Sequence, residues 1–257
     1  MHPAWASSAT FNMNLIYGKN PVREALRANK PFDKIYIASG IKTQGIQTIL
    51  EMARKRDIPV RDVDRRKLIE LVGHENHQGI VATLSAVEYS SIDDVFERAA
   101  ERGEKPLIAI LDEIQDPHNL GAIIRSAEAL GFHGIIISKN RSAGLSQTVA
   151  KTSAGASSLI PVVRVTNTAQ TIEALKSDGL WIAGADQDAS DSVEDLDVSM
   201  PIAIVIGGEE KGIRRLVKEK CDYLVRIPMH GHINSLNASV AAAIMFWEVI
   251  KKRDRTA

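Results

Sequence analysis

Three short stretches of the chain combine polar side chains with residues that shape loops. They read DPHNLGAIIR, GGEEKG and NSLNAS. The polar residues that could do chemistry in them are Asn119, Arg125, Glu209, Ser235, Asn237 and Ser239. Amides and hydroxyls can orient a substrate, a carboxylate can accept a proton, and a guanidinium matches a phosphate. The three stretches are therefore the candidates for a substrate-binding site.

Arg125 lies within a stretch that is predicted to be helical. Asp116 and Asn119 precede this stretch, so Asn119 could simply cap the helix. Arg125 lies in the run AIIRSAEAL, which predicts a mostly buried side chain. A buried guanidinium needs a partner, and a phosphate matches its fork geometry. We expect Arg125 to bind a phosphate, with a surface ion pair as the alternative.

Gly207 and Gly208 follow an apolar run directly. Glycine permits unusual φ angles and lets a ligand approach the backbone closely. Neither a Lys-Ser/Thr pair nor the spacing G-x-G-x-x-G is present, so the nucleotide-phosphate fingerprints are excluded. At least one of the neighbouring carboxylates, Glu209 or Glu210, is expected to be only solvated.

The histidines and the cysteine give weaker signals. His230 and His232 could bind a metal, but the sequence shows no third ligand. We therefore expect no metal site. His118 is expected to be a loop hydrogen-bonding residue. The single cysteine, Cys221, excludes an internal disulfide, suits a reducing cytoplasm and is interpreted as a small packed residue.

The elements that must position the polar stretches alternate regularly along the chain. The strand-like segments are PLIAILDEI, GIIIS, PVVRV, LWIAGAD, PIAIVIGGE and YLVRIPM, with helical segments between them. This alternation predicts an α/β domain with a mostly parallel sheet. Ligands bind beyond the carboxyl ends of such strands, and all three polar stretches follow strand ends. Ser235 or Asn237 is expected to start the last helix.

Composition and charge divide the chain further. Residues 1–13 are expected to be a disordered or non-native extension, 14–88 a small α/β domain, 89–104 a linker that contains an acidic helix, and 105–257 the second domain. Residues 14–88 carry 13 Lys and Arg against 9 Asp and Glu. This positive charge is explained equally well by binding to a polyanion and by an ordinary solvated surface. No apolar run approaches the ~20 residues of a membrane span, and no signal peptide is evident. These features favour a cytoplasmic protein.

Taken together and in this order, DPHNLGAIIRSAEALG, IVIGGEEKGI and IPMHGHINSLNASVAAAI resemble the three motifs of the SpoU (TrmH-type) RNA ribose 2'-O-methyltransferases. LIYGKNPVREAL and HQGIVATL resemble the ribosomal-protein-like RNA-binding module that precedes this domain in one subgroup. The whole chain is most similar to the RlmB-type subgroup, the bacterial 23S rRNA guanosine 2'-O-methyltransferases.

The resemblance implies the SPOUT fold with a trefoil knot near the C-terminus, although general topology rules make knots rare. It also implies S-adenosylmethionine as cofactor, no metal, and a homodimer through the C-terminal domains. The implied catalytic residues are Asn119, Arg125, Glu209, Ser235 and Asn237. The implied cofactor-binding residues are Gly207, Gly208, Ile227, Leu236 and Ser239. Gly208 stands where the family often has Ser or Ala, and is expected to be compatible because the backbone makes the contact.

The implied reaction is methylation of a ribose 2'-hydroxyl in 23S rRNA, with guanosine as the expected nucleoside. A tRNA or resistance-type rRNA methyltransferase, and a non-catalytic RNA-binding or ribosome-assembly protein, are the alternatives. Arg125 is effectively always protonated, so we expect it to grip a phosphate and stabilise the developing alkoxide. The proton acceptor stays open among Glu209, Ser239, water and a perturbed Arg125. The expected RNA-binding residues of the first domain are Lys19, Arg23, Arg27, Arg65 and Arg66, with Lys67 as a further candidate.

Overall fold

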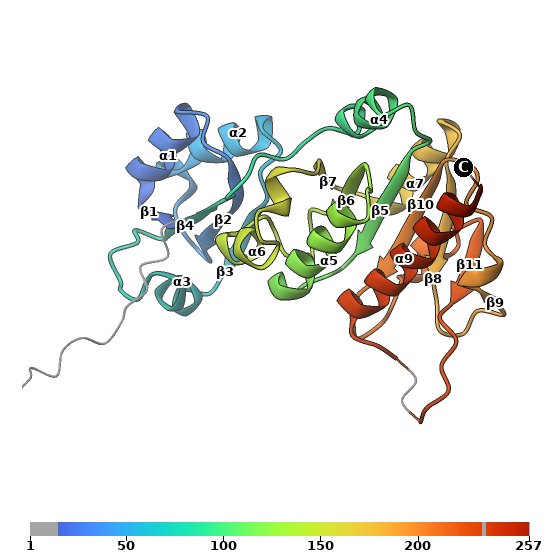
Figure 1. Cartoon of the computed structure of the whole chain (residues 1–257). Helices are drawn as coiled ribbons and strands as arrows, with labels where there is room; N and C mark the ends of the chain where they lie inside the picture. Colours follow the sequence, from blue (N-terminus) through green and yellow to red (C-terminus); the bar gives the residue numbers. More distant parts are fainter. Residues whose placement is uncertain (1–14, 233–234, 257) are drawn as a thin grey trace, which may run out of the picture. The chain divides into compact units, whose positions relative to one another are not determined.

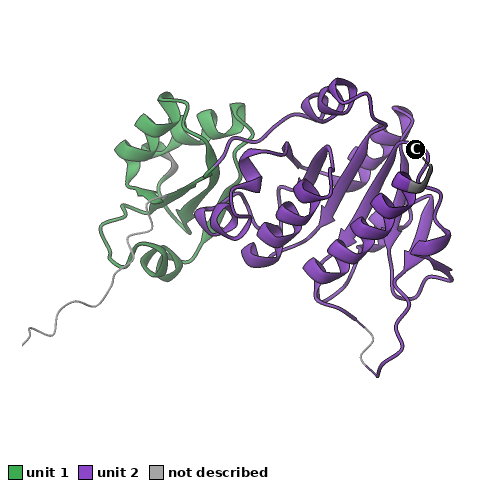
Figure 2. Cartoon of the chain, viewed as in Figure 1, with its two compact units in different colours: residues 1–86 green, residues 87–257 purple. Residues whose placement is uncertain are grey.

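The computed structural model describes residues 15–232 and 235–256, and the chain divides after Ala86 into two compact units (Figure 2). The expected extension at residues 1–13 and the first two residues of the stretch INSLNAS lie outside the described residues. Each unit has its own sheet and its own core (Figure 1).

The first unit contains a four-stranded sheet in the order β1-β4-β2-β3. Its strands are β1 (Leu15–Tyr17), β2 (Phe32–Ala38), β3 (Val60–Val63) and β4 (Ile80–Leu84). Its helices are α1 (Lys19–Arg27), η1 (Thr43–Gly45), α2 (Gln47–Lys55) and α3 (Arg65–Val72). β4 runs antiparallel to β1 and β2, whereas β3 runs parallel to β2. The carboxyl ends of β1, β2 and β3 therefore lie at one edge of the sheet, together with the start of β4.

Helices cover both faces of this small sheet. Buried residues of α1 and α2 pack with Ile35 and Ile80 on one face, and Leu68 of α3 packs with Val81 on the other. α3 ends at Gly73, whose φ of 78° makes it a left-handed C-cap, the position at which glycine is most favoured.

The second unit contains a seven-stranded sheet in the order β7-β6-β5-β10-β8-β11-β9. Every strand pair in it is parallel, which confirms the predicted sheet type. The strands are β5 (Leu107–Asp112), β6 (Gly134–Ser138), β7 (Val162–Val165), β8 (Trp181–Ala185), β9 (Asp191–Ser192), β10 (Ile202–Gly207) and β11 (Tyr223–Arg226). The helices are α4 (Ile92–Glu101), α5 (Pro117–Ala129), α6 (Gln147–Thr152), η2 (Ala156–Ser158), α7 (Thr168–Ser177), η3 (Val193–Asp195), α8 (Arg215–Lys218) and α9 (Ala238–Thr256).

Helices also cover both faces of the large sheet. Because successive side chains of a strand point to opposite faces, Leu107 and Leu111 of β5 join the core that includes α5 and α9. Ile108 and Ile110 join the core that includes α4 and α7. All six residues of β5 are buried, as expected of a central parallel strand.

Residues 89–104, expected to be a linker, contain α4 and belong to the second unit. Ser91 and Asp94 form a reciprocal capping box at its start. Val95 is fully buried and packs in the core with Ile108. Half of the residues of this helix are charged, so its composition did not indicate that Val95 and Ala99 are buried. Two of the helical segments between the strands are short in the structure. IRRLVKEKC forms only the four-residue α8, and SQTVAKTSAGASSL divides into α6 and η2.

The last helix, α9, contacts α5 and the segments that precede β5 and β10. α9 packs on the same side of the sheet as α5, and the rings of Phe132 and Phe246 lie 4.2 Å apart between centroids. Near its end, the Arg253 guanidinium donates hydrogen bonds to the backbone carbonyls of Lys105, Pro106, Val198 and Met200. These carbonyls lie just before β5 and β10. The trefoil knot stays a prediction.

No helix in the described parts of the chain combines the length and apolarity needed to cross a membrane.

Candidate active site

Asn119, Glu209 and Asn237, one from each polar stretch, form a hydrogen-bonded cluster. The Asn119 side-chain nitrogen donates to the Glu209 carboxylate, and the Asn237 nitrogen donates to the Asn119 oxygen over 3.0 Å. Asn119 is 9% exposed, whereas Glu209 and Asn237 are exposed. The cluster therefore runs from a nearly buried amide to a carboxylate that faces solvent.

Asn237 is also the residue that starts α9. Its side-chain oxygen accepts hydrogen bonds from the backbone N–H of Ser239 at 2.9 Å and from the Ser239 hydroxyl at 2.6 Å. This is the N-cap arrangement, and it satisfies an amide that the helix leaves without a partner. Of the two residues expected to start the helix, Asn237 does so.

Asp116, not Asn119, caps α5. The Asp116 carboxylate accepts from the backbone N–H of His118 at 2.9 Å, and Pro117 occupies the first helical position. The alternative of Asn119 as a cap is therefore wrong, because Asn119 lies within the first turn. Its amide is free to bind the two other members of the cluster.

Arg125 is exposed, and the prediction of a mostly buried side chain is wrong. Ile123, Ile124 and Ala127 face the core, while Arg125 falls on the side of α5 that faces solvent. Within the described residues, the Arg125 guanidinium has no hydrogen-bond or ion-pair partner. None of the described residues thus occupies the guanidinium that we expected to bind a phosphate.

The loop after β10 is closed by its own backbone. Gly212 donates its N–H to the Gly208 carbonyl over 2.9 Å. A Cβ on Gly207 would lie 2.0 Å from the Gly212 carbonyl carbon, and one on Gly208 would lie 2.7 Å from the Glu113 carbonyl oxygen. Close backbone contact, and not only the approach of a ligand, therefore favours glycine at Gly207, whereas a Cβ on Gly208 would require a smaller shift of the backbone.

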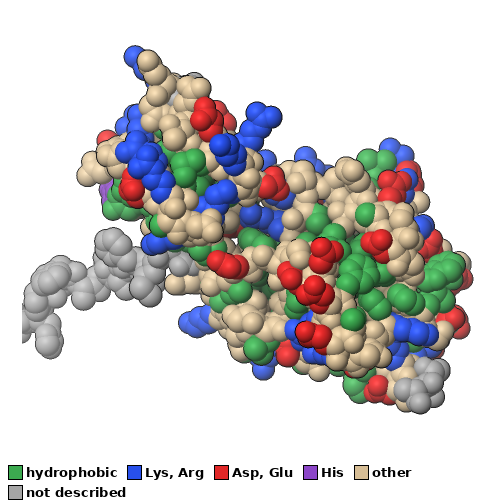
Figure 3. All heavy atoms as spheres, turned by 90° about the horizontal axis from the view of Figure 1, so that it is seen from above, with side chains coloured by type: hydrophobic (Ala, Val, Ile, Leu, Met, Phe, Trp, Pro, Cys, Tyr) green, Lys and Arg blue, Asp and Glu red, His purple; other side chains and the backbone are tan. Residues whose placement is uncertain are grey.

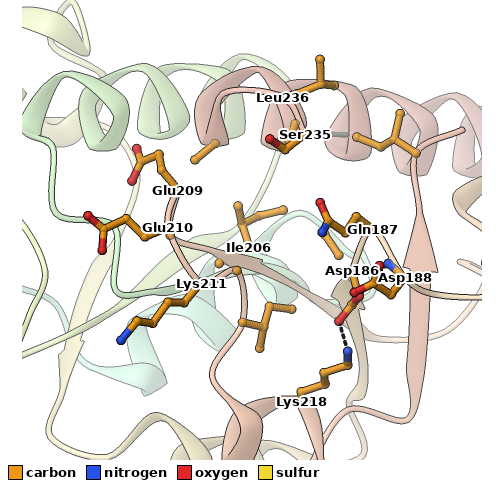
Figure 4. A pocket seen from close by; sticks show the side chains of 18 of the residues that line it. Asp186, Gln187, Asp188, Ile206, Glu209, Glu210, Lys211, Lys218, Ser235 and Leu236 are labelled. Atoms are coloured by element: carbon orange, nitrogen blue, oxygen red, sulfur yellow. Dashed lines mark hydrogen bonds and ion pairs between the residues drawn. The ribbon is translucent and has the colours of Figure 1, made fainter. Parts of the chain in front are cut away.

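A cavity of about 430 Å³ lies beside this loop. Four of the residues expected to bind the cofactor line it, namely Gly207, Gly208, Ile227 and Leu236. Glu209 and Ser235 line it as well, and Figure 4 shows Glu209, Glu210 and Lys211 on one side of the space. Ser239 is not among the lining residues, and its hydroxyl is bonded to Asn237. Arg125, Asn119 and Asn237 also lie outside the lining.

The opposite side of the cavity comes from a segment that our reading of the sequence missed. Asp186, Gln187 and Asp188 follow β8, and Asp186 forms an ion pair with Lys218 of α8 (Figure 4). The hydrogen bond from Lys218 to Asp186 raises the pKa of the lysine. Polar residues directly after a parallel strand were the available signal, because such ends form binding crevices.

An ion pair between a buried carboxylate and a half-buried guanidinium holds the end of the loop. Asp112 is fully buried and accepts from the Arg214 backbone N–H at 2.9 Å and from its guanidinium at 2.5 Å. The hydrogen bond to Asp112 raises the pKa of Arg214. The residue after Asp112, Glu113, has a φ of 63°, an uncommon conformation for a side-chain-bearing residue. The backbone of Asp112 and Glu113, against which Gly208 packs, is thus held in place by the bonds to Arg214.

The residues expected to bind RNA lie in the first unit, over which Lys and Arg side chains gather in Figure 3. Arg23 and Arg27 both approach the Glu24 carboxylate, at 3.7 and 2.9 Å. Lys67 pairs with Glu70 at 3.0 Å. The side chains of the remaining three, Lys19, Arg65 and Arg66, have no acidic partner among the described residues.

Cys221 is half-buried and lies on the other side of the sheet from α9. Burial raises the pKa of its thiol to about 12, so the thiol stays protonated at neutral pH. Within the described residues, no group of three or more His, Cys, Asp or Glu could hold a metal ion.

Two family models match the chain. One, the SpoU rRNA Methylase family, matches residues 106–247, and the other, RNA 2'-O ribose methyltransferase substrate binding, matches residues 15–90.

Individual proteins agree with these matches. YacO of Bacillus subtilis, assigned to the TrmH family of tRNA/rRNA methyltransferases, is 47% identical over 239 residues, which cover 93% of this chain and 96% of YacO. The SpoU methyltransferase AviRb of Streptomyces viridochromogenes, solved with AdoMet, is 26% identical with a TM-score of 0.60 and covers 94% of this chain and 90% of AviRb. An AdoMet-bound rRNA methyltransferase of Sinorhizobium meliloti shares the fold, with a TM-score of 0.57 and 24% identity. The match covers 93% of this chain and 87% of the Sinorhizobium meliloti chain.

Proposed function

Because the chain belongs to the SpoU rRNA methylase family, we propose that it methylates the 2'-hydroxyl of a ribose in RNA, with S-adenosylmethionine as the methyl donor. The observation that carries the proposal is the cluster of Asn119, Glu209 and Asn237, whose carboxylate lines the cavity. The cluster supplies oriented polar groups at the edge of a space that can hold a cofactor.

The cavity fits the proposed cofactor in size and charge. Small-molecule sites have volumes of about 300–1,000 Å³, and this one is about 430 Å³. The lining carries four carboxylates, Asp186, Asp188, Glu209 and Glu210, against the two cations Lys211 and Lys218. S-adenosylmethionine carries a sulfonium and an ammonium group, which complement this excess of negative charge. When bound, it supplies an electrophilic methyl group.

The chain must still align the ribose hydroxyl and accept its proton, because a neutral alcohol is a poor nucleophile. Glu209 is the one carboxylate of the cluster, and we assign proton acceptance to it. Asn119 holds one carboxylate oxygen, and Asn237 holds Asn119 in the orientation that donates to Glu209. The hydrogen-bonded chain thus orients the acceptor.

Arg125 serves as the phosphate ligand in this proposal. Its guanidinium is exposed and, within the described residues, has no partner to displace. A guanidinium binds a phosphate through two parallel hydrogen bonds, which a lysine cannot reproduce. It also keeps its proton, so it stabilises negative charge and does not act as the base.

Substitution of Glu209 tests the assignment of the proton acceptor. Glu209→Gln should lower kcat by about 100-fold, since general-base contributions are about 10²–10⁴. The measurement is transfer of labelled methyl from S-adenosylmethionine to RNA, with 2'-O-methylnucleosides identified by mass spectrometry. Glu210→Gln is the matched control in the same loop. A Glu209→Gln enzyme with the kcat and pH profile of the unmodified protein would rule the assignment out.

Arg125→Lys tests the phosphate role. We expect about a 10-fold higher KM for RNA with an unchanged KM for S-adenosylmethionine, because the lost fork contacts only RNA. Arg215→Lys, another exposed arginine, should change neither constant. Near-normal turnover and RNA affinity in Arg125→Lys would contradict the proposal.

For the substrate we propose 23S rRNA with guanosine as the nucleoside. Support comes from the match of residues 15–90 to a substrate-binding family model and from the whole-chain relatives that are assigned to tRNA/rRNA methylation. Mapping 2'-O-methylation in RNA from a deletion strain tests this directly. Loss of a single guanosine methylation in 23S rRNA is expected, whereas loss from tRNA would transfer the activity to the alternative substrate.

We also propose a cytoplasmic homodimer formed through the second unit. Val240 and Trp247 are 46% and 55% exposed and lie seven residues apart on α9, which places them on one face. Large exposed apolar side chains on one face are typical of an interface. Trp247→Glu should therefore convert the dimer to a monomer in sedimentation equilibrium, and a protein that is monomeric before substitution would exclude the dimer.

A further inference from the structure

The first unit carries an aromatic pair that the proposed chemistry does not use. The rings of Tyr17 and His74 lie edge to face, with centroids 4.7 Å apart and planes at 72°. Tyr17 is 36% exposed and ends β1, and His74 follows the glycine that ends α3. The pair therefore presents aromatic surface at the outside of the unit.

The backbone around the pair is well fixed. Tyr17 pairs with Val81 of β4, and the N–H of Gly18 donates to the Ile80 carbonyl over 3.0 Å. The His74 Nδ1 accepts from the Asn76 N–H over 3.2 Å. A binding surface with this support loses little conformational freedom when a ligand binds.

Positive charge lies at the same edge of the sheet. β1 and β3 end there, so Lys19, which starts α1, and Arg65 and Arg66, which start α3, all follow strand ends at this edge. Lys19 is tied to the loop before β4, because its N–H donates to the Gln78 side chain over 3.1 Å. As described above, the side chains of these three cations have no acidic partner among the described residues, in contrast to Arg23, Arg27 and Lys67.

We propose that Tyr17 and His74 form a stacking site for one unpaired base of the RNA, with Lys19, Arg65 and Arg66 holding the flanking phosphates. Every nucleobase has a π-face, so stacking on aromatic side chains is strong and tolerant of sequence. Cations at the same edge of the sheet neutralise phosphates of the strand that carries the stacked base. A base in a continuous duplex is already stacked, so the site selects a loop or bulge. This inference rests on the proposed function, in that the substrate is RNA.

Salt dependence separates stacking from phosphate contact. A stacking contact releases no counterions, whereas each phosphate contact contributes close to one unit to the slope of log K against log salt. Tyr17→Leu should thus weaken binding about tenfold at every salt concentration and leave the slope unchanged. Arg65→Gln should lower both the affinity and the slope, by about one unit.

The experiment measures fluorescence anisotropy of the full chain with two labelled RNAs, a hairpin with a randomised loop and a fully paired duplex of equal length. Tyr17→Leu is expected to lose affinity for the hairpin only, while Tyr17→Phe, which keeps the ring, should match the unmodified protein. Equal affinity of Tyr17→Leu and the unmodified protein for the hairpin would overturn the site, as would an equal loss for both RNAs.

A second measurement does not depend on the folding of a variant. Loops that carry 5-iodouracil should crosslink to Tyr17 or His74 on irradiation of the unmodified protein, with the site read by mass spectrometry. Crosslinks confined to other residues would overturn the proposal. If the unmodified protein binds neither RNA, the RNA substrate itself fails, a result distinct from failure of the stacking site.

Discussion

Asn237 combines two tasks that could otherwise fall to separate residues. Its side-chain oxygen caps α9, and its side-chain nitrogen binds Asn119. Because both atoms belong to one amide, the position of the helix start and the orientation of the hydrogen-bonded cluster are linked. A substitution can separate the two tasks.

Asn237→Asp keeps an oxygen for the cap and loses the donor to Asn119. We expect unfolding free energy within about 0.5 kcal/mol of the unmodified protein, because Asp and Asn are comparable caps. We expect kcat to fall at least about 10-fold, since a lost hydrogen bond in a half-buried network costs about 1–3 kcal/mol. Urea unfolding and the methyl-transfer assay measure the two effects.

Asn237→Ala should lose both tasks, with about 1 kcal/mol less stability in addition to the lower kcat. Asn167, which caps α7 by accepting from the Gln170 N–H, gives the matched control, since Asn167→Ala should lose stability alone. An Asn237→Asp enzyme of normal kcat would show that the link to Asn119 is not used in catalysis.

At the same scale, the sequence predicted which polar residues could carry the chemistry but not all of their environments. Asn119, Glu209 and Asn237 meet as bonded neighbours, which a motif can suggest only through resemblance. Arg125 is surrounded in the sequence by apolar residues. Because of the helical period its side chain nevertheless faces solvent, whereas the neighbouring Ile124 is buried. Asp186 and Lys218 lie 32 positions apart and are brought together only by the sheet order.

At the scale of elements, the loop between β10 and α8 is determined by its two ends. Gly207 lies against the backbone of Gly212, and Arg214 is held by the buried Asp112. The wall of the cavity is therefore built from backbone packing and one ion pair. It should tolerate changes of side chain far better than changes of backbone shape.

Gly207→Ala tests this view of the loop. A Cβ placed 2.0 Å from the Gly212 carbonyl carbon forces the backbone to move. We expect a loss of about 1–3 kcal/mol in unfolding free energy, as for other overpacked sites, and a KM for S-adenosylmethionine raised at least about 10-fold. Arg215→Ala, an exposed change just beyond the same loop and outside the cavity lining, should leave both values near normal. Calorimetric titration of the cofactor measures the affinity, and unchanged binding by Gly207→Ala would refute the packing argument.

The order of strands and helices was largely predictable, because hydrophobic period and length distinguish them. The segments that differ are short or partly buried in an unexpected way. β1 and β9 have three and two residues, too few to show a period. In α4 only Val95 and Ala99 are buried among acidic neighbours, so a core helix resembled a linker.

At the scale of the whole molecule, the stability of the second unit should depend on pH through His133. Its side chain is 1% exposed, Nδ1 accepts from the Leu107 N–H at 3.0 Å, and Nε2 lies 3.1 Å from the Glu104 carboxylate. Burial lowers the pKa of His133, although Glu104 opposes this effect. The unfolded chain therefore binds a proton more readily than the folded one below about pH 6.5.

Stability should accordingly be constant above that pH and fall as the pH drops from about 6.5 through the lowered pKa of His133. Glu104→Gln should steepen the fall, because it removes the charge that raises the pKa. His133→Asn, which keeps an acceptor for Leu107, should flatten it. Urea unfolding followed by tryptophan fluorescence reports this unit, which contains Trp181 and Trp247. Equal pH slopes in the three proteins would contradict the role of His133.

The hydrogen bonds of Arg253 have a consequence for biosynthesis. The guanidinium binds the carbonyl of Lys105, 148 positions earlier in the chain, so the first strand of the second unit is secured by a residue of its last helix, α9. A ribosome exposes the chain from its N-terminus, and contacts of such long separation form slowly. The first unit can fold while synthesis continues, but the second reaches its final hydrogen bonding only after α9 has left the ribosome. A chain interrupted before Arg253 should therefore stay dependent on chaperones, although every residue that lines the cavity is present.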